Sequence, residues 1–468
     1  MMSELFQDSA LLQEIDRFVE EQKDSIVRDI GRLVAIPSVE SEPEPGAPYG
    51  PGPQQALDCA LGIAAELGLK TASCCENRMG YAQVGEERGE GYLATISHVD
   101  VVPAGEGWPE DPFTLREQEG YLIGRGVTDD KGPSILCLYA LKYLQDSGRR
   151  LRYPIRALLG SSEEIGMDDI GYYLAEYPAP LFCVSPDSDF PAVNGEKGIY
   201  HARLVSRHQP DRVLDIAGGV APNAVAAAAT ARVRADALRD GGGVHAEQLE
   251  PGLWQLSAAG ISGHASMPEG TVSAIALLVD YLLENGIPGP DELPYFHLLQ
   301  RLHRNTDGSG LGLQSADGRF TPLTAVGGKI STENGVIAQT IDCRYGTTMS
   351  GEKITALLRS AAGKAADVQE DSDEAPFYME PDHPAIQACI DSYRAVTGED
   401  TRPQTIGGGT YARHFPKACS FGPEHRDRPM PDFCGPIHGV NEAAGLGDLL
   451  EALKIYILTL LRLEELDY

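Results

Sequence analysis

The sequence lacks a run of apolar residues long enough to cross a lipid bilayer. Its apolar runs, such as Ala274–Val279 and Ile455–Leu461, are far shorter than the ~20 residues that a spanning helix needs. The acidic, amphipathic N-terminal segment has neither the basic nor the apolar region of a signal peptide. The nine cysteines include no CxxC pair, which argues against a zinc-finger or disulfide framework. We therefore expect a soluble, cytoplasmic protein with reduced thiols.

Basic residues are scarce. Lys and Arg number 38 against 69 Asp and Glu, so the formal net charge is −31. Such a surface repels phosphate backbones and anionic lipids, so neither nucleic acid nor a membrane is an expected partner. Hydrophobic residues make up 42% of the chain, as is usual for globular proteins. Because 468 residues exceed the ~100–200 residues of a typical domain, we expect two or more domains.

Helical and strand-like patterns alternate along the first part of the chain. Apolar residues recur at helical spacing over 11–33. A helix is also expected over 54–67, where Gly68 is a suitable C-cap, and over 133–144, where a proline stands in the first turn. Three short apolar runs between or after these segments read as strands: Tyr92–Ser97, Ile155–Leu159 and Leu181–Val184. Each run leads directly into polar residues, and sites in α/β sheets form beyond the carboxyl ends of strands. The pattern therefore predicts an α/β sheet with a site at that edge.

The composition changes between residues 194 and 375. This stretch contains an Ala-rich segment at 223–231, the glycines 241–243 and several strand-like runs. We interpret it as a second domain inserted into the first. Residues 1–193 and 376–468 then form the first domain, which carries the predicted site and ends in an apolar helix near 446–463.

The polar residues that follow the predicted strands form a candidate metal-binding set together with two residues elsewhere in the chain. The set comprises His98, Asp100, Asp129, Glu163, Glu164, Asp187 and His438. One histidine and one carboxylate can ligate each of two divalent ions, with a further carboxylate bridging them. Mixed nitrogen and oxygen donors suit Zn²⁺, and also Mn²⁺ or Co²⁺. Two such ions ~3.5–4 Å apart can activate a shared water and polarise a carbonyl group.

Local spacing suggests how some of these residues divide the work. His98 and Asp100 lie two residues apart, so in an extended strand their side chains share a face, and Asp100 can orient the imidazole. Glu163 and Glu164 diverge because they are adjacent, so one can ligate while the other acts as general base. Taken singly, each residue also has an ordinary structural explanation, such as a strand-end histidine, a solvated acidic pair or a turn aspartate.

Eight segments in order resemble a known enzyme family. They are SHVDVVPAGEGW (97–108), GRGVTDDKGP (124–133), SSEEIGMDD (161–169), SPDSDFPAVNGEKG (185–198), SGHASMPEG (262–270), DCRYG (342–346), GGGTYAR (407–413) and PIHGVNE (436–442). The chain resembles, over nearly its whole length, the di-zinc metallopeptidases that include dipeptidases, carnosinases, glutamate carboxypeptidase, aminoacylase and acetylornithine deacetylase. It looks most like their PepV-type bacterial dipeptidases. The resemblance implies an α/β, mixed-sheet aminopeptidase-like (phosphorylase/hydrolase-like) catalytic domain with an inserted α+β lid domain.

The resemblance also implies a ligand set and a chemistry. One ion would be held by His98, Asp129 and Asp187, and the other by Asp129, Glu164 and His438, with Asp129 bridging. Glu163 matches the general base, Asp100 the residue that orients His98, and a cis peptide is implied at Asp129–Asp130. Asp189 stands where relatives often carry Glu, so it is an alternative to Asp187.

The resemblance places further roles in the lid. His264 matches a histidine that stabilises the oxyanion, and Arg344 matches the residue that pairs with the terminal carboxylate of the substrate. Asn223 matches a polar residue near the substrate, and Gly409 and Thr410 lie in a loop that can donate to the same carboxylate. Without the resemblance, Arg344 is interpreted as a member of a surface ion pair, His264 as a loop histidine and Gly407–Gly409 as a turn.

These matches imply a metal-dependent dipeptidase that acts on dipeptides or short peptides, as a monomer or loose homodimer. A deacylase or deacetylase of N-acyl amino acids on the same architecture is the first alternative, because the substrate class depends on analogy. A catalytically silent binding protein is a more remote alternative, since every expected ligand is present.

Overall fold

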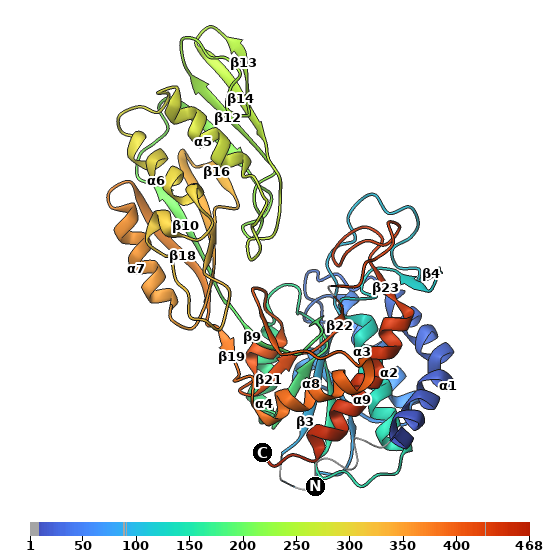
Figure 1. Ribbon diagram of the computed structural model, residues 1–468. Helices are drawn as coiled ribbons and strands as arrows, with labels where there is room; N and C mark the ends of the chain where they lie inside the picture. Colours follow the sequence, from blue (N-terminus) through green and yellow to red (C-terminus); the bar gives the residue numbers. More distant parts are fainter. Residues whose placement is uncertain (1–8, 88, 90, 426) are drawn as a thin grey trace. The chain divides into compact units, whose positions relative to one another are not determined.

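The computed structural model describes residues 9–87, 89, 91–425 and 427–468. The chain forms two compact units, drawn in Figure 1. The first contains the chain up to Asn194 together with Met379–Gln404 and Thr410–Tyr468, and the second contains Gly195–Tyr378 and Thr405–Gly409. Each unit has its own sheet and is described separately.

The first unit is built on a mixed sheet. Its strands follow the order β1-β2-β6-β3-β7-β21-β9. The centre is parallel, because β3 pairs in parallel with both β6 and β7, and β7 with β21, whereas β1, β2 and β9 join antiparallel. The bounds are β1 Lys70–Cys74, β2 Met79–Val84, β3 Leu93–His98, β6 Ile155–Gly160, β7 Phe182–Ser185, β9 Val193–Glu196 and β21 Ala418–Ser420.

Every residue of β3, β6 and β7 is buried, as expected for parallel strands covered on both faces. These three strands are the three short apolar runs of the sequence, and their predicted positions are confirmed. Because β3 lies between β6 and β7 and all three run in parallel, their carboxyl ends meet at one edge of the sheet.

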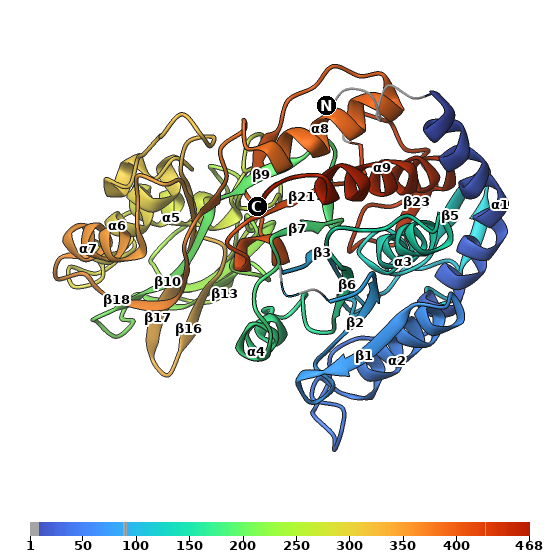
Figure 2. The ribbon, with the colours of Figure 1, turned by 90° about the horizontal axis from the view of Figure 1, so that it is seen from below.

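Helices pack on this sheet and on one another. Helix α3 contacts β2, β3 and β6, and α9 lies beside both α3 and α8 (Figures 1 and 2). Helix α2 begins at Pro51, where a proline is tolerated, and stops before Gly68, whose φ of 82° lies in the left-handed region. The bounds are α1 Ser9–Val34, α2 Pro51–Glu66, α3 Lys131–Asp146, α4 Asp168–Glu176, α8 Pro384–Thr397 and α9 Leu446–Glu464.

Two small sheets lie beside the main one in the first unit. Strand β23 (Ala443–Gly445) pairs with β5 (Tyr121–Ile123), which pairs with β4 (Arg116–Gln118). Strand β22 (Pro423–Glu424) pairs with β8 (Ser188–Asp189). The first of these sheets brings together two segments that are far apart in the sequence and that carry candidate ligands.

The second unit is an antiparallel sheet covered by three helices (Figure 1). The strand order is β13-β14-β12-β11-β16-β17-β10-β18, with β15 also pairing with β17. The strands are β10 Gly198–Ser206, β11 Val213–Gly218, β12 Ala228–Arg234, β13 Val244–Glu250, β14 Leu253–Ala259, β15 Thr324–Val326, β16 Ile330–Glu333, β17 Val336–Tyr345 and β18 Ala366–Glu374. Burial along β12 alternates, as it does when only one face of a sheet is covered.

Helices α5 (Ala274–Glu284), α6 (Leu293–Arg304) and α7 (Gly351–Ala362) bury their apolar faces against that sheet. The first residues of α5 and α7 follow serines that cap them: the hydroxyl of Ser273 accepts from the N–H of Ala276, and that of Ser350 from the N–H of Lys353. The resulting core cluster consists of residues of this unit alone, and Val225, Ala265 and Val326 form a second, smaller cluster.

The bounds of the two units differ from the sequence prediction in three places. Asn194 belongs to the first unit, and residues 376–378 belong to the second. Residues 405–409 were expected in the catalytic domain, but they belong to the second unit. The physical reason is local hydrogen bonding: the N–H of Lys197 donates to the carbonyl of Ile406 at 3.0 Å, and Arg344 donates to the carbonyl of Gly407 at 3.2 Å. Strands β19 (Phe377–Tyr378) and β20 (Gln404–Ile406) pair with β9 where the chain passes between the units.

Candidate metal centre and active site

Polar side chains converge at the carboxyl ends of the parallel strands in the first unit. His98 is the last residue of β3, Glu163 and Glu164 follow β6, and Asp187 follows β7. Asp129 precedes α3, whose first residue is Lys131. The sequence analysis expected the strand-end residues to share one edge of a sheet, and the strand order brings them there.

Three of the predicted ligands form a first group. Nε2 of His98 lies 2.9 Å from Oδ1 of Asp129 and 3.8 Å from Oδ2 of Asp187. Nδ1 of His98, which is fully buried, lies 3.1 Å from the backbone carbonyl of Asp100 and 3.5 Å from its carboxylate. A carbonyl can only accept, so Nδ1 carries the proton and the lone pair of Nε2 faces the carboxylates. Asp100 thus orients the ring chiefly through its main chain.

Three predicted ligands form a second group that shares Asp129. Nε2 of His438 lies 2.9 Å from Oδ2 of Asp129 and 3.1 Å from Oε2 of Glu164. His438 itself has a φ of 60°. The two oxygens of Asp129 therefore face different histidines, which is the arrangement of a bridging carboxylate. The Asp129–Asp130 peptide is cis, so that prediction is confirmed.

Asp130 and Asp189, which stand close in sequence to the predicted ligands Asp129 and Asp187, belong to neither ligand group. The carboxylate of Asp130 is buried and accepts from the N–H of His98 at 3.1 Å, so it supports the end of β3. Asp189 forms β8, and Asp187 is the residue that faces His98. The alternative of Asp189 as the ligand is not supported by this geometry.

The protonation behaviour of the groups reflects crowded negative charge. Burial, and next the charge of Asp129, raise the pKa of Asp187 to about 8. Burial and the charge of Asp129 also raise the pKa of Glu164. Hydrogen bonds to Asp129 and Glu164 raise the pKa of His438 to about 10. Burial alone would raise the pKa of Asp129, but hydrogen bonds from His438 and His98 outweigh it and lower that pKa.

This donor set fits a pair of divalent cations. Each group offers one imidazole nitrogen and carboxylate oxygens within 4.8 Å of one another, the ligand types that Zn²⁺ takes in hydrolases. Cations would relieve the repulsion that raises the carboxylate pKa values. A third cluster, His425, Asp448 and Glu451, differs because Arg428 already forms ion pairs with both of its carboxylates.

The turn that carries Glu163 and Glu164 is fastened from two sides. The N–H of Glu164 donates to Oδ2 of Asp100 at 3.1 Å. Buried Asp169 accepts from the N–H groups of Ser161 and Ser162 and, at 2.6 Å, from the hydroxyl of Tyr411. Asp169 and Tyr411 stand in two of the segments that resemble the family, but no role was predicted for either, because the bond between them joins residues 242 positions apart.

Glu163 lies in the same turn without acting in either ligand group. Burial, and next the charge of Asp187, raise its pKa well above the usual range. A carboxylate that is held close to the ligands and binds a proton readily has the properties of a general acid and base.

Two predicted residues lie on neighbouring segments of the second unit. The carbonyl of Asn223 accepts from the N–H of Ala265 at 2.9 Å, and Ala224 forms an antiparallel bridge with His264. Nδ1 of His264 accepts from the N–H of Ser266 at 3.2 Å. When the ring is neutral its proton therefore lies on Nε2, the atom that can donate.

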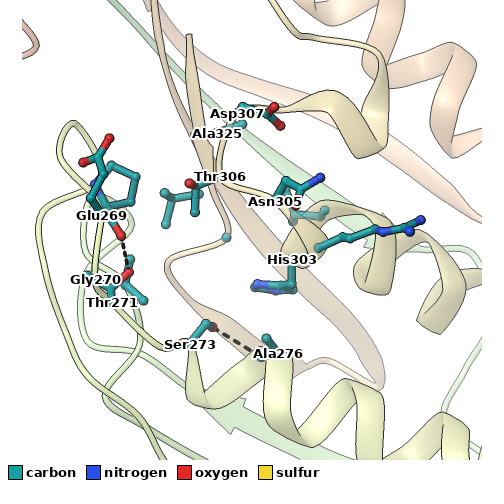
Figure 3. A pocket seen from close by; sticks show the side chains of 16 residues that line it. Glu269, Gly270, Thr271, Ser273, Ala276, His303, Asn305, Thr306, Asp307 and Ala325 are labelled. Atoms are coloured by element: carbon teal, nitrogen blue, oxygen red, sulfur yellow. Dashed lines mark hydrogen bonds between the residues drawn. The ribbon is translucent and has the colours of Figure 1, made fainter. Parts of the chain in front are cut away.

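The loop after His264 also borders a cavity of about 580 Å³ in the second unit. Glu269, Gly270 and Thr271 lie on one side, and Asn305 and Thr306 face them (Figure 3). No pattern in the sequence predicted this cavity.

Arg344 is buried in an ion pair within the second unit. Its Nε and Nη2 donate to the two oxygens of Asp342 at 2.8 and 2.9 Å, and Asp342 also contacts His201 at 2.9 Å. Arg344 is 4% exposed, so the surface ion pair considered from the sequence is wrong. Asp342 is a partner that the sequence analysis missed, although it stands two residues away on β17.

The residues of the glycine loop are divided between the units: Gly409 belongs to the second and Thr410 to the first. Buried Thr410 caps the short turn that begins at Tyr411, because its hydroxyl accepts from the N–H of Ala412 at 3.1 Å and contacts Ser420 at 2.8 Å. Its side chain is therefore engaged in local structure.

Comparison with known proteins identifies the family. Residues 94–462 match the model of Peptidase family M20/M25/M40. The chain belongs to this family. A Beta-Ala-Xaa dipeptidase of Lactobacillus delbrueckii subsp. lactis is 30% identical to this family member over 462 residues, which cover 93% of this chain and 95% of that protein.

Solved structures of low sequence identity share the fold. Human carnosine dipeptidase 1 aligns with a TM-score of 0.60 at 16% identity, covering 97% of this chain and 99% of that one. The di-peptidase Dug1p of Saccharomyces cerevisiae aligns with a TM-score of 0.59 at 16% identity, covering 98% and 99%. The predictions of the family, of the fold class and of an enzyme of the hydrolase class are confirmed.

None of the helices in the described part of this peptidase family member combines the length and the apolar character needed to span a membrane.

Proposed function

We propose that this protein is a dipeptidase that uses two divalent cations to hydrolyse the peptide bond of dipeptides or short peptides. The observation that carries the proposal is the position of Asp129: each of its oxygens lies 2.9 Å from the Nε2 atom of a different histidine. It thereby joins the two ligand groups into one candidate dinuclear centre. The donor set suits Zn²⁺ best, with Mn²⁺ or Co²⁺ as the other candidates.

The relative from L. delbrueckii supports the substrate class, because its name is that of a dipeptidase and the alignment covers nearly the whole of both chains. The chemistry follows from the residues. When bound, a pair of divalent cations supplies Lewis acidity and lowers the pKa of solvent. Glu163 accepts the proton of the attacking water and then delivers it to the leaving amine. The buried carbonyl of Asp100 holds His98 in the tautomer that ligates.

We assign the remaining roles mainly to the second unit. The Nε2–H of His264 donates to the oxyanion that develops on the scissile carbonyl. Arg344, held rigidly by Asp342, receives the terminal carboxylate of the substrate. Asn223 and the loop at Gly409 and Thr410 add polar contacts to the substrate. Support for these roles comes from the resemblance and from the hydrogen bonds described above.

Hydrolysis of a dipeptide library tests the proposal. Purified protein is stripped with a chelator and assayed after addition of Zn²⁺ or Mn²⁺, with N-acetyl amino acids in parallel. We expect cleavage of free dipeptides that disappears on chelation and returns with the metal. Faster cleavage of N-acetyl amino acids would instead identify a deacylase, and full activity in the stripped protein would refute a metal-dependent reaction.

The remaining expectations about the molecule stay predictions. We propose a cytoplasmic enzyme without nucleic-acid or membrane partners, present as a monomer or loose homodimer. Light scattering coupled to size exclusion measures the oligomeric state, and cell fractionation measures the location.

A further inference from the structure

A buried ion pair lies behind the candidate metal centre of the first unit. Nη1 of Arg125 contacts Oε2 of Glu442 at 2.5 Å, and both side chains are 1% exposed. The two residues stand 317 positions apart. Neither belongs to a ligand group.

Each member of the pair grips the backbone of a ligand-bearing segment. Oε1 of Glu442 accepts from three N–H groups, those of Gly126 at 3.1 Å, Thr128 at 3.0 Å and Asp129 at 3.2 Å. Nη2 of Arg125 donates to the carbonyls of His438 at 3.1 Å and Gly439 at 3.2 Å. Glu442 thus holds the backbone of the segment that contains Asp129, and Arg125 holds the backbone of the segment that contains His438.

Each member of the ion pair therefore contacts the backbone of the other member's segment. Arg125 belongs to the Asp129 segment but holds the His438 segment, and Glu442 belongs to the His438 segment but holds the Asp129 segment. Pairing of β5 with β23 ties the same two segments together. In addition to this pairing, the N–H of Gly124 donates to the carbonyl of Glu442 at 3.0 Å and the hydroxyl of Thr128 to the carbonyl of Ala443 at 3.1 Å. The ion pair adds contacts to the backbone of Asp129 and His438 themselves.

The carboxylate of Glu442 is well placed to fix the backbone, because one of its oxygens accepts from several N–H groups at once. Successive N–H groups that converge on one oxygen form an anion-binding concavity, and a charged acceptor strengthens each bond. The planar guanidinium of Arg125 can bond Glu442 and two carbonyls at once, which the single ammonium of a lysine cannot reproduce.

We propose that Arg125 and Glu442 are positioning residues that set the spacing between Asp129 and His438, and thereby the affinity of the cation held by Asp129, Glu164 and His438. This inference rests on the proposed function, because it presumes the pair of cations. The first group depends on the pair only through Asp129, since its histidine, His98, is held by the end of β3 and by hydrogen bonds to Asp100 and Asp130.

Cation binding to the stripped protein tests the inference without using activity. Calorimetric titration with Zn²⁺ gives two dissociation constants, and elemental analysis gives the number of ions retained. For Glu442→Gln and Arg125→Lys we expect one ion to bind within about threefold of wild type. We expect the other to bind about 10- to 100-fold more weakly, as for residues that orient ligands from behind. Glu442→Gln keeps one acceptor oxygen, so Glu442→Ala should have the larger effect.

A matched control separates positioning from stability. Asp29 is also a buried carboxylate of the first unit, 1% exposed, and it bonds Arg32 at 3.1 Å and Tyr139 at 2.8 Å. We expect Asp29→Asn to lower the melting temperature of the stripped protein while leaving both zinc dissociation constants unchanged.

The outcomes are distinct. The positioning role would be overturned if both zinc dissociation constants were unchanged in Glu442→Gln and Glu442→Ala. It would also be overturned if these variants and Asp29→Asn all weakened the binding of both ions to the same extent. Arg125→Lys gives the same readout if the glutamate variants do not fold. Fewer than two ions in the wild-type protein would instead refute the cation pair of the proposed function.

Discussion

Replacing Glu163 with Gln separates the proposed general base from the ligands beside it. Gln has nearly the same shape as Glu, and the neighbouring Glu164 keeps its own contacts to His438 and Asp100. Loss of a general base costs about 10²- to 10⁴-fold in rate. At about 1.4 kcal/mol per tenfold, the barrier therefore rises by about 3–5 kcal/mol. We expect kcat to fall by this factor while two cations stay bound.

The same change has a second, opposite effect on the stripped protein. Burial and the charge of Asp187 raise the pKa of Glu163, so the folded state binds this proton more tightly than the unfolded state does. The stability that Glu163 contributes is complete below its unfolded pKa of ~4.3 and is lost as pH rises through the folded pKa. Glu163→Gln has no such loss. Without cations, the variant should be more stable than wild type near pH 8 and equal to it near pH 4.

Three measurements test the assignment of Glu163 as the general base. Initial rates on a cleaved dipeptide give kcat, elemental analysis gives the cation content, and urea unfolding of stripped protein at the two pH values gives stability. Glu164→Gln is the matched control: it should lose rate together with one cation. A Glu163→Gln enzyme with kcat within tenfold of wild type would reject the assignment. Loss of both cations would show instead that Glu163 is a ligand.

Further predictions concern both units. Arg344→Lys keeps the charge but loses the planar fork, so KM for dipeptides should rise about 10- to 100-fold, at ~1.5–3 kcal/mol for a charged hydrogen bond, and an unchanged KM would refute carboxylate binding. Burial lowers the pKa of His303 to about 4, so its contribution to stability falls as pH drops below its unfolded pKa of ~6.5. In urea titrations, replacement by Asn should remove about 2 kcal/mol of the stability difference between pH 7.5 and pH 5, and an unchanged difference would contradict a partly buried imidazole that is neutral in the folded state. A Cβ at Gly132 would lie 2.1 Å from the carbonyl of Val127, so Gly132→Ala should lower the free energy of unfolding by about 1–3 kcal/mol. Gly62→Ala, with open space around its Cβ, should raise it by about 0.5–1 kcal/mol, and equal effects of the two would refute the steric argument.

Local patterns in the sequence predicted much of the first unit. The apolar runs that became β3, β6 and β7 are short and fully buried, and the polar residues directly after them must lie where parallel strands end. The helices α1, α2, α3 and α9 were predicted from apolar spacing and from turn residues such as Gly68. These features depend on residues close together in the chain, so periodicity and spacing reveal them.

The assignment of ligands to each of two ions was predicted only through the resemblance of eight ordered segments, because single residues such as His438 have common structural explanations. The details between segments were not predicted. The bonds from Asp169 to Tyr411 and the contact of Asp342 with His201 join residues 242 and 141 positions apart. No short-range pattern records such pairs.

By itself, then, the amino-acid order determined the types of donor atoms, the strand ends that carry several of them and the family to which the chain belongs. Tertiary structure decided which oxygen of Asp129 faces which histidine. It also decided that residues 405–409 belong with the second unit and that Arg125 and Glu442 hold one another's segments. These outcomes depend on directional hydrogen bonds between distant parts of the backbone, which form only after the sheets have brought those parts together.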